Sequence, residues 1–356
     1  MKTIIINGYD ISSKKVTGIQ RVIIETLKSI DAYLVKQHLD LDIRVCYPKD
    51  LHLMLPELRI IQKVPLQENR RFWEIRVLQK YVAHEKGIYC AMGNNITFIK
   101  HSLVLLHDIS PIVGKQFFRK RTRLKAWLYA KTIGYNASKI VTVSKYQKIL
   151  ISKKLKRKLE DIEVIYPGHE HIYDIQSDET VFQKFIHIQK GSYYYALGSL
   201  AKHKNYKWVY EVAQRNPTKQ FVVAGYMRTP KIVNTLEKSN NNNIIYLGYV
   251  SDQENKALLE HCKAFLQPSF MEGFAIPPLE AISLHKPVFL SNSSCLPEIY
   301  KGLASFFDPN DYSVNLDCFV LPDQQSYDKA MARYSWEKAG EKWIKLFEEK
   351  MRDYDV

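Results

Sequence analysis

Two glutamates, Glu272 and Glu280, lie in a short segment whose other residues favour a binding site over a core. The segment covers residues 269–281 and reads SFMEGFAIPPLEA. Proline is tolerated in the first turn of a helix, because the N–H that it lacks would have no partner inside the helix. The proline pair therefore predicts a helix that runs to about Leu284. Glu280 lies in its first turn and Glu272 just before it.

The N-terminus of this predicted helix favours a phosphate, and the two carboxylates favour neutral hydroxyls. Gly273 and the residues before it would direct backbone N–H groups along the helix start, where the helix dipole also attracts an anion. A carboxylate beside a phosphate is electrostatically unfavourable, so both glutamates are predicted to accept hydrogen bonds from hydroxyls such as those of a sugar. The alternative is that Glu280 only complements the helix dipole and Glu272 is a turn residue.

The pattern Glu272-x7-Glu280 within PSFMEGFAIPPLEA resembles the signature of the retaining glycosyltransferases of family 4, which have the GT-B fold. The resemblance covers the C-terminal half almost continuously and the N-terminal half thinly. Four further segments carry it: Leu197–Asn205 is similar to a phosphate-binding loop, Ile244–Glu254 to the strand and turn beside the nucleotide base, and Lys286–Glu298 and Ala304–Asn310 to the strand and turns after the signature helix.

The resemblance implies roles for individual residues. Lys204 matches a phosphate-binding lysine, Glu280 the glutamate that binds the ribose, and Glu272 the one that contacts the transferred sugar. The sequence departs from the family at His203 and Ser199, where members often have arginine, and Lys202 is expected to supply the missing charge. The implied catalytic residues are Glu272, Lys204 and His107. The implied donor site comprises Gly18, Ser199, Lys202, Lys204, Tyr249, Val250, Glu272, Gly273, Phe274, Ala275 and Glu280.

In the N-terminal half, His107 directly follows an apolar strand in VLLHDISPI, which places it at the carboxyl end of a parallel sheet. It resembles a family histidine near the donor sugar, although a lone histidine is often structural. Gly18 in VTGIQRV resembles the glycine loop that meets the donor phosphates. Ser144 in VTVSKYQ matches a common family position, but capping of a helix explains it equally well.

Apolar runs of strand length alternate with helical patterns, which predicts parallel sheets with crossover helices. The alternation starts afresh after a polar stretch at residues 174–190, interpreted as an interdomain linker. The predicted fold class is α/β, specifically GT-B, with two Rossmann-like doubly wound parallel-sheet domains facing a central cleft. The predicted domains are residues 1–172 for the acceptor and 173–333 for the nucleotide sugar. Residues 334–356 are predicted to form a helix that packs back on the first domain.

The chain has 356 residues and a formal net charge of +15, and much of the excess lies in Arg119–Lys125 and Lys153–Lys158. Such clusters fit an anionic membrane surface, a lipid pyrophosphate or simply a solvated helix face, and nucleic acid fits less well because no nucleic-acid motif accompanies them. Five scattered cysteines favour a reducing compartment over a zinc site. No apolar run approaches the ~20 residues of a membrane span. We therefore expect a cytoplasmic protein, peripheral on the inner face of the cell membrane.

The predicted function is retaining transfer of a hexose or deoxyhexose from a nucleotide diphosphate sugar to a saccharide or lipid-linked acceptor in surface polysaccharide (O-antigen or capsule) synthesis. Mannose is the first donor sugar to consider, because GIQR resembles mannosyl- and rhamnosyl-transferring members. No cofactor and no metal are expected. Two alternatives remain: a catalytically idle nucleotide-sugar sensor or scaffold, and a nucleic-acid-binding protein.

Overall fold

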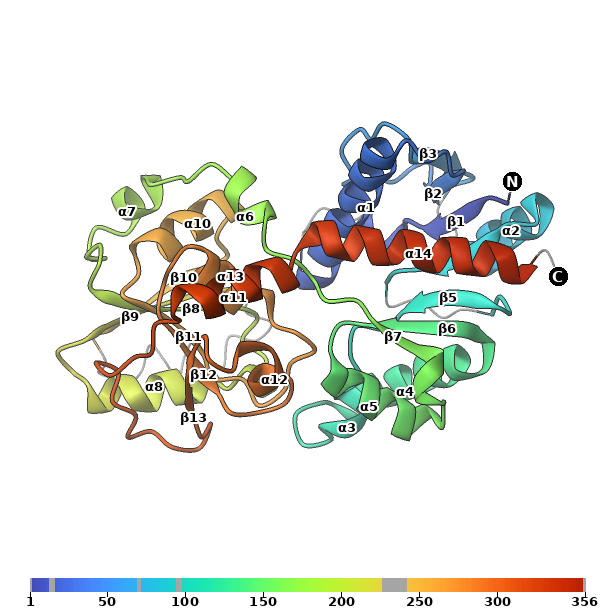
Figure 1. Ribbon diagram of the computed structural model, residues 1–356. Helices are drawn as coiled ribbons and strands as arrows, with labels where there is room; N and C mark the ends of the chain where they lie inside the picture. The colour runs from blue at the N-terminus through green and yellow to red at the C-terminus, as the bar shows by residue number, and fades with distance from the viewer. Residues whose placement is uncertain (1, 13–16, 69–71, 94–97, 226–241, 355–356) are drawn as a thin grey trace. The chain divides into compact units, whose positions relative to one another are not determined.

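The computed structural model describes residues 2–12, 17–68, 72–93, 98–225 and 242–354. The chain divides into two compact units, coloured from blue to red along the chain in Figure 1. The N unit comprises Met1–Val113, Arg119–Gly168 and Tyr334–Val356, and the C unit comprises Gly114–Phe118 and His169–Arg333. Each unit contains one parallel sheet with helices around it, which confirms the predicted pair of Rossmann-like α/β domains.

The N unit has a seven-stranded sheet in the order β3-β2-β1-β4-β5-β6-β7. Central strands such as β1 (sequence IIIN) are buried at every position, as expected of a parallel strand covered on both faces. The strands are β1 (Ile4–Asn7), β2 (Ile43–Pro48), β3 (Gln62–Leu66), β4 (Ile88–Ala91), β5 (Ser102–Leu105), β6 (Ala137–Thr142) and β7 (Ile162–Val164).

Helices connect these strands as crossovers. They are α1 (Gly18–Gln37), α2 (Gln79–Glu85), α3 (Ser110–Val113), α4 (Lys120–Asn136) and α5 (Lys145–Leu155), with short helical turns η1 (Tyr9–Ile11) and η3 (Leu159–Asp161) and a π-helical turn η2 (Glu74–Leu78). Ser144 caps α5, because its hydroxyl oxygen accepts a hydrogen bond from the Gln147 N–H at 3.2 Å.

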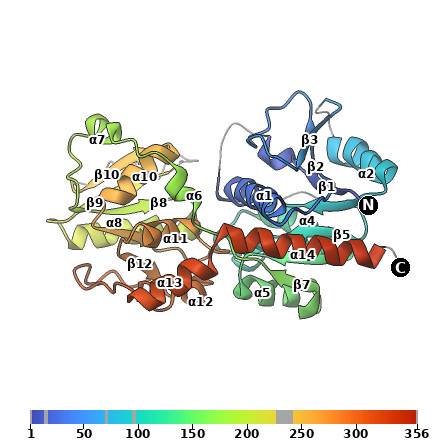
Figure 2. The same ribbon diagram turned by 45° about the horizontal axis from the view of Figure 1, so that its top comes forward.

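The last helix, α14 (Trp336–Tyr354), lies beside α1 in both views of the ribbon (Figures 1 and 2). The two helices approach closely because Gly340 has no side chain: a Cβ there would meet the Ser29 Oγ at 2.2 Å. Trp343 and Phe347, one helical turn apart, are almost fully buried. The N unit is therefore assembled from both ends of the chain.

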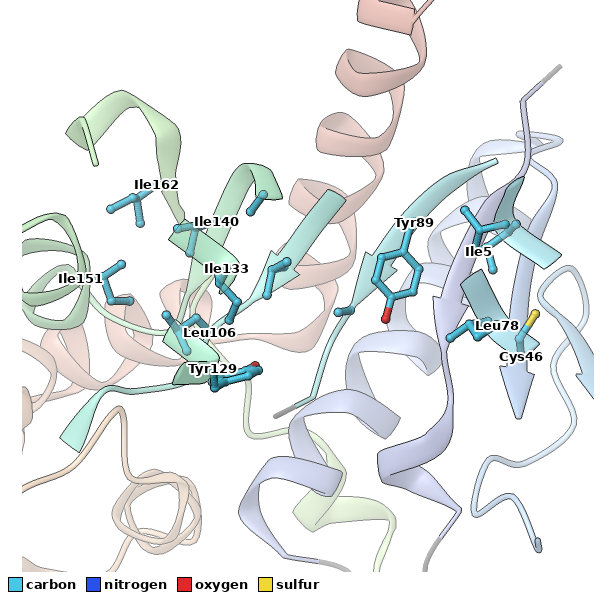
Figure 3. Packing of buried hydrophobic residues seen from close by; sticks show 14 of the residues in the cluster. Ile5, Cys46, Leu78, Tyr89, Leu106, Tyr129, Ile133, Ile140, Ile151 and Ile162 are labelled. Atoms are coloured by element: carbon cyan, nitrogen blue, oxygen red, sulfur yellow. The ribbon is translucent and has the colours of Figure 1, made fainter. Parts of the chain in front are cut away.

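A buried cluster packs one face of the N-unit sheet against its helices (Figure 3). Ile5 and Tyr89 come from central strands, Ile133 from α4 and Ile151 from α5, and all are buried. Ile4 and Ile6, which point to the opposite face by the alternation of a strand, are fully buried too. Both faces of the sheet are thus covered.

The C unit has a six-stranded sheet in the order β10-β9-β8-β11-β12-β13. Its strands are β8 (Tyr193–Leu197), β9 (Gln220–Ala224), β10 (Ile244–Gly248), β11 (Ala264–Gln267), β12 (Val288–Ser291) and β13 (Ser305–Phe307). Its helices are α6 (His171–Asp174), α7 (Thr180–Lys184), α8 (Tyr206–Arg215), α10 (Asp252–His261), α11 (Ile276–Ser283), α12 (Leu296–Tyr300) and α13 (Gln324–Arg333), with the short turn η4 (Lys202–Lys204).

The polar stretch 174–190 is not the interdomain linker that the sequence suggested. It belongs to the C unit, where Val181 of α7 is fully buried and the Asp178 N–H donates to the Gln253 carbonyl at 3.0 Å. Apart from the C-unit segment Gly114–Phe118, the units divide between Gly168 and His169 and again between Arg333 and Tyr334. The polar residues of this stretch therefore occupy exposed positions of short helices and loops in the C unit, and they do not form an interdomain linker.

Candidate active site

The candidate site lies at the carboxyl edge of the C-unit sheet, where the strand order reverses direction. Strand β8 is flanked by β9 on one side and β11 on the other, so the chain leaves β8 and β11 on opposite sides of the sheet. Ligands of open α/β sheets bind at this type of switch point. The loops that follow β8 (198–205) and β11 (268–275) meet there, since the Phe270 N–H donates to the His203 carbonyl at 2.8 Å.

Glycines shape the first of these loops. Gly198 has a φ of +147° and Gly225, at the end of β9, a φ of +142°. A Cβ on Gly225 would lie 1.8 Å from the Gly198 carbonyl oxygen, so the two strand ends can approach only without side chains. The loop then makes the single turn η4, and Asn205, in the left-handed conformation (φ 54°), leads into α8. Lys202, His203 and Lys204 are thereby presented at the sheet edge.

The structure brings Lys204 and Glu272 together. The Lys204 Nζ lies 2.8 Å from both carboxylate oxygens of Glu272. The Glu272 side chain is 8% exposed and the Lys204 side chain 23% exposed, so the pair is largely removed from water. A buried carboxylate needs such a partner, because an unpaired charge in this position costs several kcal/mol.

Neighbouring side chains hold Glu272 in place. The Gln267 Nε2 donates to the Glu272 Oε1 at 2.7 Å, and the backbone N–H of Glu272 donates to the Ser294 hydroxyl at 3.1 Å. Burial raises the pKa of Glu272, but the charge and hydrogen bonds of Lys204, with smaller contributions from Ser269 and His203, hold that pKa below its ordinary value. Glu272 is therefore an anionic hydrogen-bond acceptor at neutral pH.

Helix α11 begins at Ile276, with Pro277 and Pro278 in its first turn, as predicted from the proline pair. Because prolines lack an N–H, the first turn offers fewer donors than an ordinary helix start. A phosphate bound at this helix start must therefore accept hydrogen bonds from the backbone N–H groups of the residues before Pro277. Ala275, the residue before the helix, has a φ of 71°. Ala275 carries a Cβ, and this backbone conformation favours glycine.

Glu280 is the fifth residue of α11, so it lies in the second turn and not in the first turn as predicted, and it is 8% exposed. Its Oε1 is 2.8 Å from the Nε2 of His171, which is buried in α6. The two glutamates that are predicted to bind hydroxyls thus have different side-chain partners: Lys204 for Glu272 and His171 for Glu280.

The remaining predicted donor residues of the C unit differ in exposure. Tyr249 is 62% exposed after β10, whereas Val250 is buried. Phe274 is buried, and its neighbour Gly273 is half-buried. Ser199 and Lys202 are exposed on the loop after β8.

His107 and Gly18 belong to the N unit. His107 follows β5 and is buried, and its Nε2 lies 2.9 Å from the Met92 carbonyl oxygen. A carbonyl only accepts, so Nε2 carries the proton. Burial lowers the pKa of His107, so the imidazole is neutral at pH 7. Gly18 is the first residue of α1 and is exposed, and a Cβ there would meet no atom within 4 Å.

Sequence reasoning missed three residues that complete the C-unit site: His171, Gln267 and Ser294. A signal existed for Gln267, because it is a polar residue at the end of the apolar strand AFLQ, where a parallel sheet presents its functional side chains. Nothing in the sequence around His171 distinguishes it from a surface histidine.

Within the described ranges, no group of three or more His, Cys, Asp or Glu side chains is placed to hold a metal ion. No helix in that part of the chain is long and apolar enough to cross a membrane. The chemistry that the C-unit site offers is thus one carboxylate fixed by a lysine, a second carboxylate fixed by a histidine, and backbone amides between them.

Comparison with known proteins gives this arrangement a context. Residues 177–313 match the family model described as glycosyl transferases group 1. The chain is 26% identical to O-antigen chain mannosyltransferase B of Escherichia coli over 69% of its length and 66% of that protein. It is 27% identical to O-antigen chain mannosyltransferase RfbU of Salmonella typhimurium, covering 75% of the chain and 74% of that protein.

A shorter match, at 31% identity over 37% of the chain and 36% of the relative, is to N,N'-diacetylbacillosaminyl-diphospho-undecaprenol alpha-1,3-N-acetylgalactosaminyltransferase of Campylobacter jejuni. Among solved structures, sucrose-phosphate synthase of Thermosynechococcus elongatus superposes with a TM-score of 0.73 at 12% identity, covering 99% of this chain and 100% of that one. HepE of Anabaena, solved with UDP-glucose, gives 0.69 at 16% identity over 98% and 100%. These two likenesses concern the fold.

Proposed function

We propose that this glycosyltransferase, whose C unit carries the group 1 domain, is a retaining enzyme of family 4. We propose that it transfers mannose from a nucleotide diphosphate sugar to a saccharide or lipid-linked acceptor during O-antigen or capsule synthesis. The observation that carries the proposal is the Lys204–Glu272 pair at the switch point of the C-unit sheet. The names of two relatives, both O-antigen mannosyltransferases, support mannose as the sugar.

In this proposal Lys204 neutralises the charge that builds on the leaving diphosphate. An ammonium has three N–H donors, and two of them point to the oxygens of Glu272, so a third can reach a phosphate oxygen. Fixed cations and amides that meet developing charge in a water-poor site are usually the largest contribution to catalysis. Lys204 would thus couple the diphosphate to the residue that holds the sugar.

Glu272 and Glu280 bind hydroxyls in this proposal. Glu272 accepts from the transferred sugar, and Glu280 accepts from the ribose while His171 fixes its orientation. Retention then follows from attack by the acceptor hydroxyl on the face that the diphosphate leaves, and the proton passes to the departing phosphate. We assign sugar binding rather than nucleophilic attack to Glu272, because its carboxylate is held by Lys204 and Gln267.

We further propose that the N unit binds an anionic membrane surface through the α4 face, defined as Leu124, Trp127 and Leu128. These side chains are 59%, 47% and 46% exposed, which is unusual for large apolar residues gathered on one helix. Exposed basic residues flank them, and the Lys131 Nζ lies over the Trp127 ring at 5.0 Å. Apolar anchors among cations are typical of helices that lie in a membrane interface.

The experiment that tests the proposed function screens GDP-, UDP- and dTDP-linked sugars for thermal stabilisation of the purified protein. A ligand that binds only the folded state raises the apparent stability by about 2.7 kcal/mol at a hundredfold excess over its Kd. We expect GDP-mannose to raise the melting temperature most. Stabilisation by another sugar nucleotide alone would overturn the donor, and stabilisation by none would overturn the function.

A product assay completes the test. With GDP-mannose and a prenyl diphosphate-linked saccharide as acceptor, NMR of the product reports the anomeric configuration of the new bond. Retention of the α configuration of the donor is expected. A β-mannoside would contradict the assignment to the retaining enzymes of family 4.

A further inference from the structure

A cavity of about 430 Å³ in the C unit has a different character from the candidate donor site beside it. Its size falls within the range of about 300–1,000 Å³ that is typical of ligand pockets. Carbon-rich side chains dominate its lining, and two lysines and two amides are the other contributors. The lining residues are Gln116, Phe117, Leu200, Ala201, Lys202, Asn205, Tyr206, Lys207, Tyr210 and Phe270.

Specific contacts fix the walls of this cavity. The Phe117 ring stacks on the Phe270 ring, with centroids 5.0 Å apart and planes 17° apart. The next residue, Phe118, stacks on His203 at 4.9 Å. The segment Gly114–Phe118 is thereby held against both loops of the donor site, which explains why it belongs to the C unit.

Two of the polar groups of the lining, those of Asn205 and Tyr210, have hydrogen-bond partners inside the protein. The Asn205 Nδ2 donates to the Pro309 carbonyl at 2.9 Å, and the Tyr210 hydroxyl accepts from the Gln214 Nε2 at 2.9 Å. A hydroxyl-rich sugar in this cavity would lose hydrogen bonds to water and gain few in return, which is unfavourable. The lining therefore favours an apolar occupant.

The lysines of the lining further restrict which ligands the cavity can hold. Lys202 and Lys207 line the cavity and are both exposed, so two cationic side chains lie beside an otherwise apolar lining. Lys204, the proposed diphosphate ligand, lies in the same turn as Lys202. An occupant that fits has an apolar body and an anionic head.

We propose that this cavity binds the isoprenoid portion of a prenyl diphosphate-linked acceptor, with its diphosphate at Lys202 and Lys207. The inference rests on the proposed function, because it assumes an acceptor that is linked to a lipid. It adds a binding site for the acceptor that lies in the C unit, separate from the residues assigned to the donor except for Lys202.

The test measures binding of farnesyl diphosphate, a short prenyl diphosphate, to the full-length protein by calorimetry. Inorganic pyrophosphate supplies the anion alone and farnesol the apolar chain alone. We expect farnesyl diphosphate to bind at least about tenfold more tightly than pyrophosphate, because its apolar chain leaves water when it enters the cavity. Equal affinity for the two anions would overturn the proposal.

Two variants locate the site. Tyr210→Ala removes one wall of the cavity and should weaken the binding of farnesyl diphosphate by roughly tenfold, because less apolar surface is buried. Lys207→Gln should weaken farnesyl diphosphate and leave farnesol unchanged. Lys190→Gln, which changes an exposed lysine elsewhere in the C unit, is the matched control and should change neither. Unaltered affinity in both test variants would place the prenyl group elsewhere.

Nucleotide sugar binding separates this proposal from the proposed function. Tyr210→Ala and Lys207→Gln should keep the donor affinity of the wild type, which also shows that they fold. Displacement of farnesol, which carries no anion, by GDP would mean that the cavity takes the nucleotide, and it would overturn the prenyl site. If no nucleotide sugar binds the wild type, the proposed function fails whether or not farnesyl diphosphate binds.

Discussion

At the scale of single residues, the backbone of Ala275 carries information that the sequence pattern could not. An alanine in the left-handed conformation costs roughly 1–2 kcal/mol, whereas glycine adopts it readily. The Tyr300 hydroxyl donates to the Ala275 carbonyl at 2.5 Å, and α11 starts at the next residue, so the surrounding structure maintains the conformation.

Ala275→Gly should therefore stabilise the protein. The relief of strain exceeds the roughly 0.4–1 kcal/mol that glycine loses through the freedom of the unfolded chain. We expect a net gain of about 0.5–1 kcal/mol in the free energy of unfolding, measured by thermal or urea denaturation. Ala281→Gly, in the interior of the same helix, is the control and should destabilise by about 1 kcal/mol. Equal losses in both variants would show that Ala275 is not strained.

A second residue-scale prediction concerns Glu74, where the π-helical turn η2 begins. Its Oε1 accepts from the Asn7 Nδ2 at 2.7 Å, and burial, opposed by that hydrogen bond, raises the pKa of Glu74 from 4.5 to about 7. Between these two values the folded protein holds a proton that the unfolded chain has released. The contribution of Glu74 thus favours folding at low pH and is lost as the pH rises through 7.

Glu74→Gln should raise the free energy of unfolding at pH 8 by on the order of 1–2 kcal/mol and have little effect at pH 5. One pKa unit corresponds to about 1.4 kcal/mol, and the effect is reduced because this side chain is partly exposed. Urea denaturation at both pH values measures the effect. Glu57→Gln, at a side chain that is 93% exposed, serves as the control. An equal effect of Glu74→Gln at the two pH values would contradict the assignment.

At the scale of elements, the sequence predicted the long apolar strands and the helix α11, because continuous aliphatic runs and a proline pair have local physical meanings. It did not predict β3 and β4. Strand β3 reads QKVPL at an edge of the sheet and is mostly exposed, and β4 has only the four residues IYCA. Edge exposure and short length remove the signal that periodicity needs, and only pairing with β2 and β1 defines these strands.

The α4 face is also a property of an element, since the sequence shows basic residues but not which apolar side chains the fold leaves exposed. Replacing both Leu124 and Trp127 with Ser should reduce binding to vesicles that contain anionic lipid, because each buried apolar side chain contributes about 1.5–3 kcal/mol. Sedimentation with vesicles measures the bound fraction. Leu321→Ser, at a leucine that is 56% exposed in the C unit, is the control.

Two results bear on the membrane proposal. Binding that disappears in high salt but is unaffected by the double substitution would indicate adsorption by charge alone. Undiminished binding of the double variant at every salt concentration would contradict a role for the α4 face.

At the scale of the whole molecule, the sequence predicted the two-sheet architecture, because each unit repeats the alternation of apolar strands and helices. It also singled out Lys204 and Glu272, which the structure brings together. The partners that orient them could not be predicted. His171 is separated from Glu280 by 109 positions and Lys204 from Glu272 by 68, and such pairings exist only after the sheet has formed. In the N unit the sequence placed His107 at a strand end, but burial decides its charge state.

The central claim is that Lys204 and Glu272 together hold an activated sugar, and calorimetry of GDP-mannose tests it most directly. Lys204→Met alone leaves Glu272 buried without its cation, so the double variant Lys204→Met, Glu272→Gln keeps the pair neutral and guards against misfolding. Lys190→Met is the control. We predict that the double variant binds GDP-mannose at least about tenfold more weakly than the wild type, since hydrogen bonds to charged groups contribute about 1.5–3 kcal/mol. Wild-type affinity in a folded double variant would contradict the account.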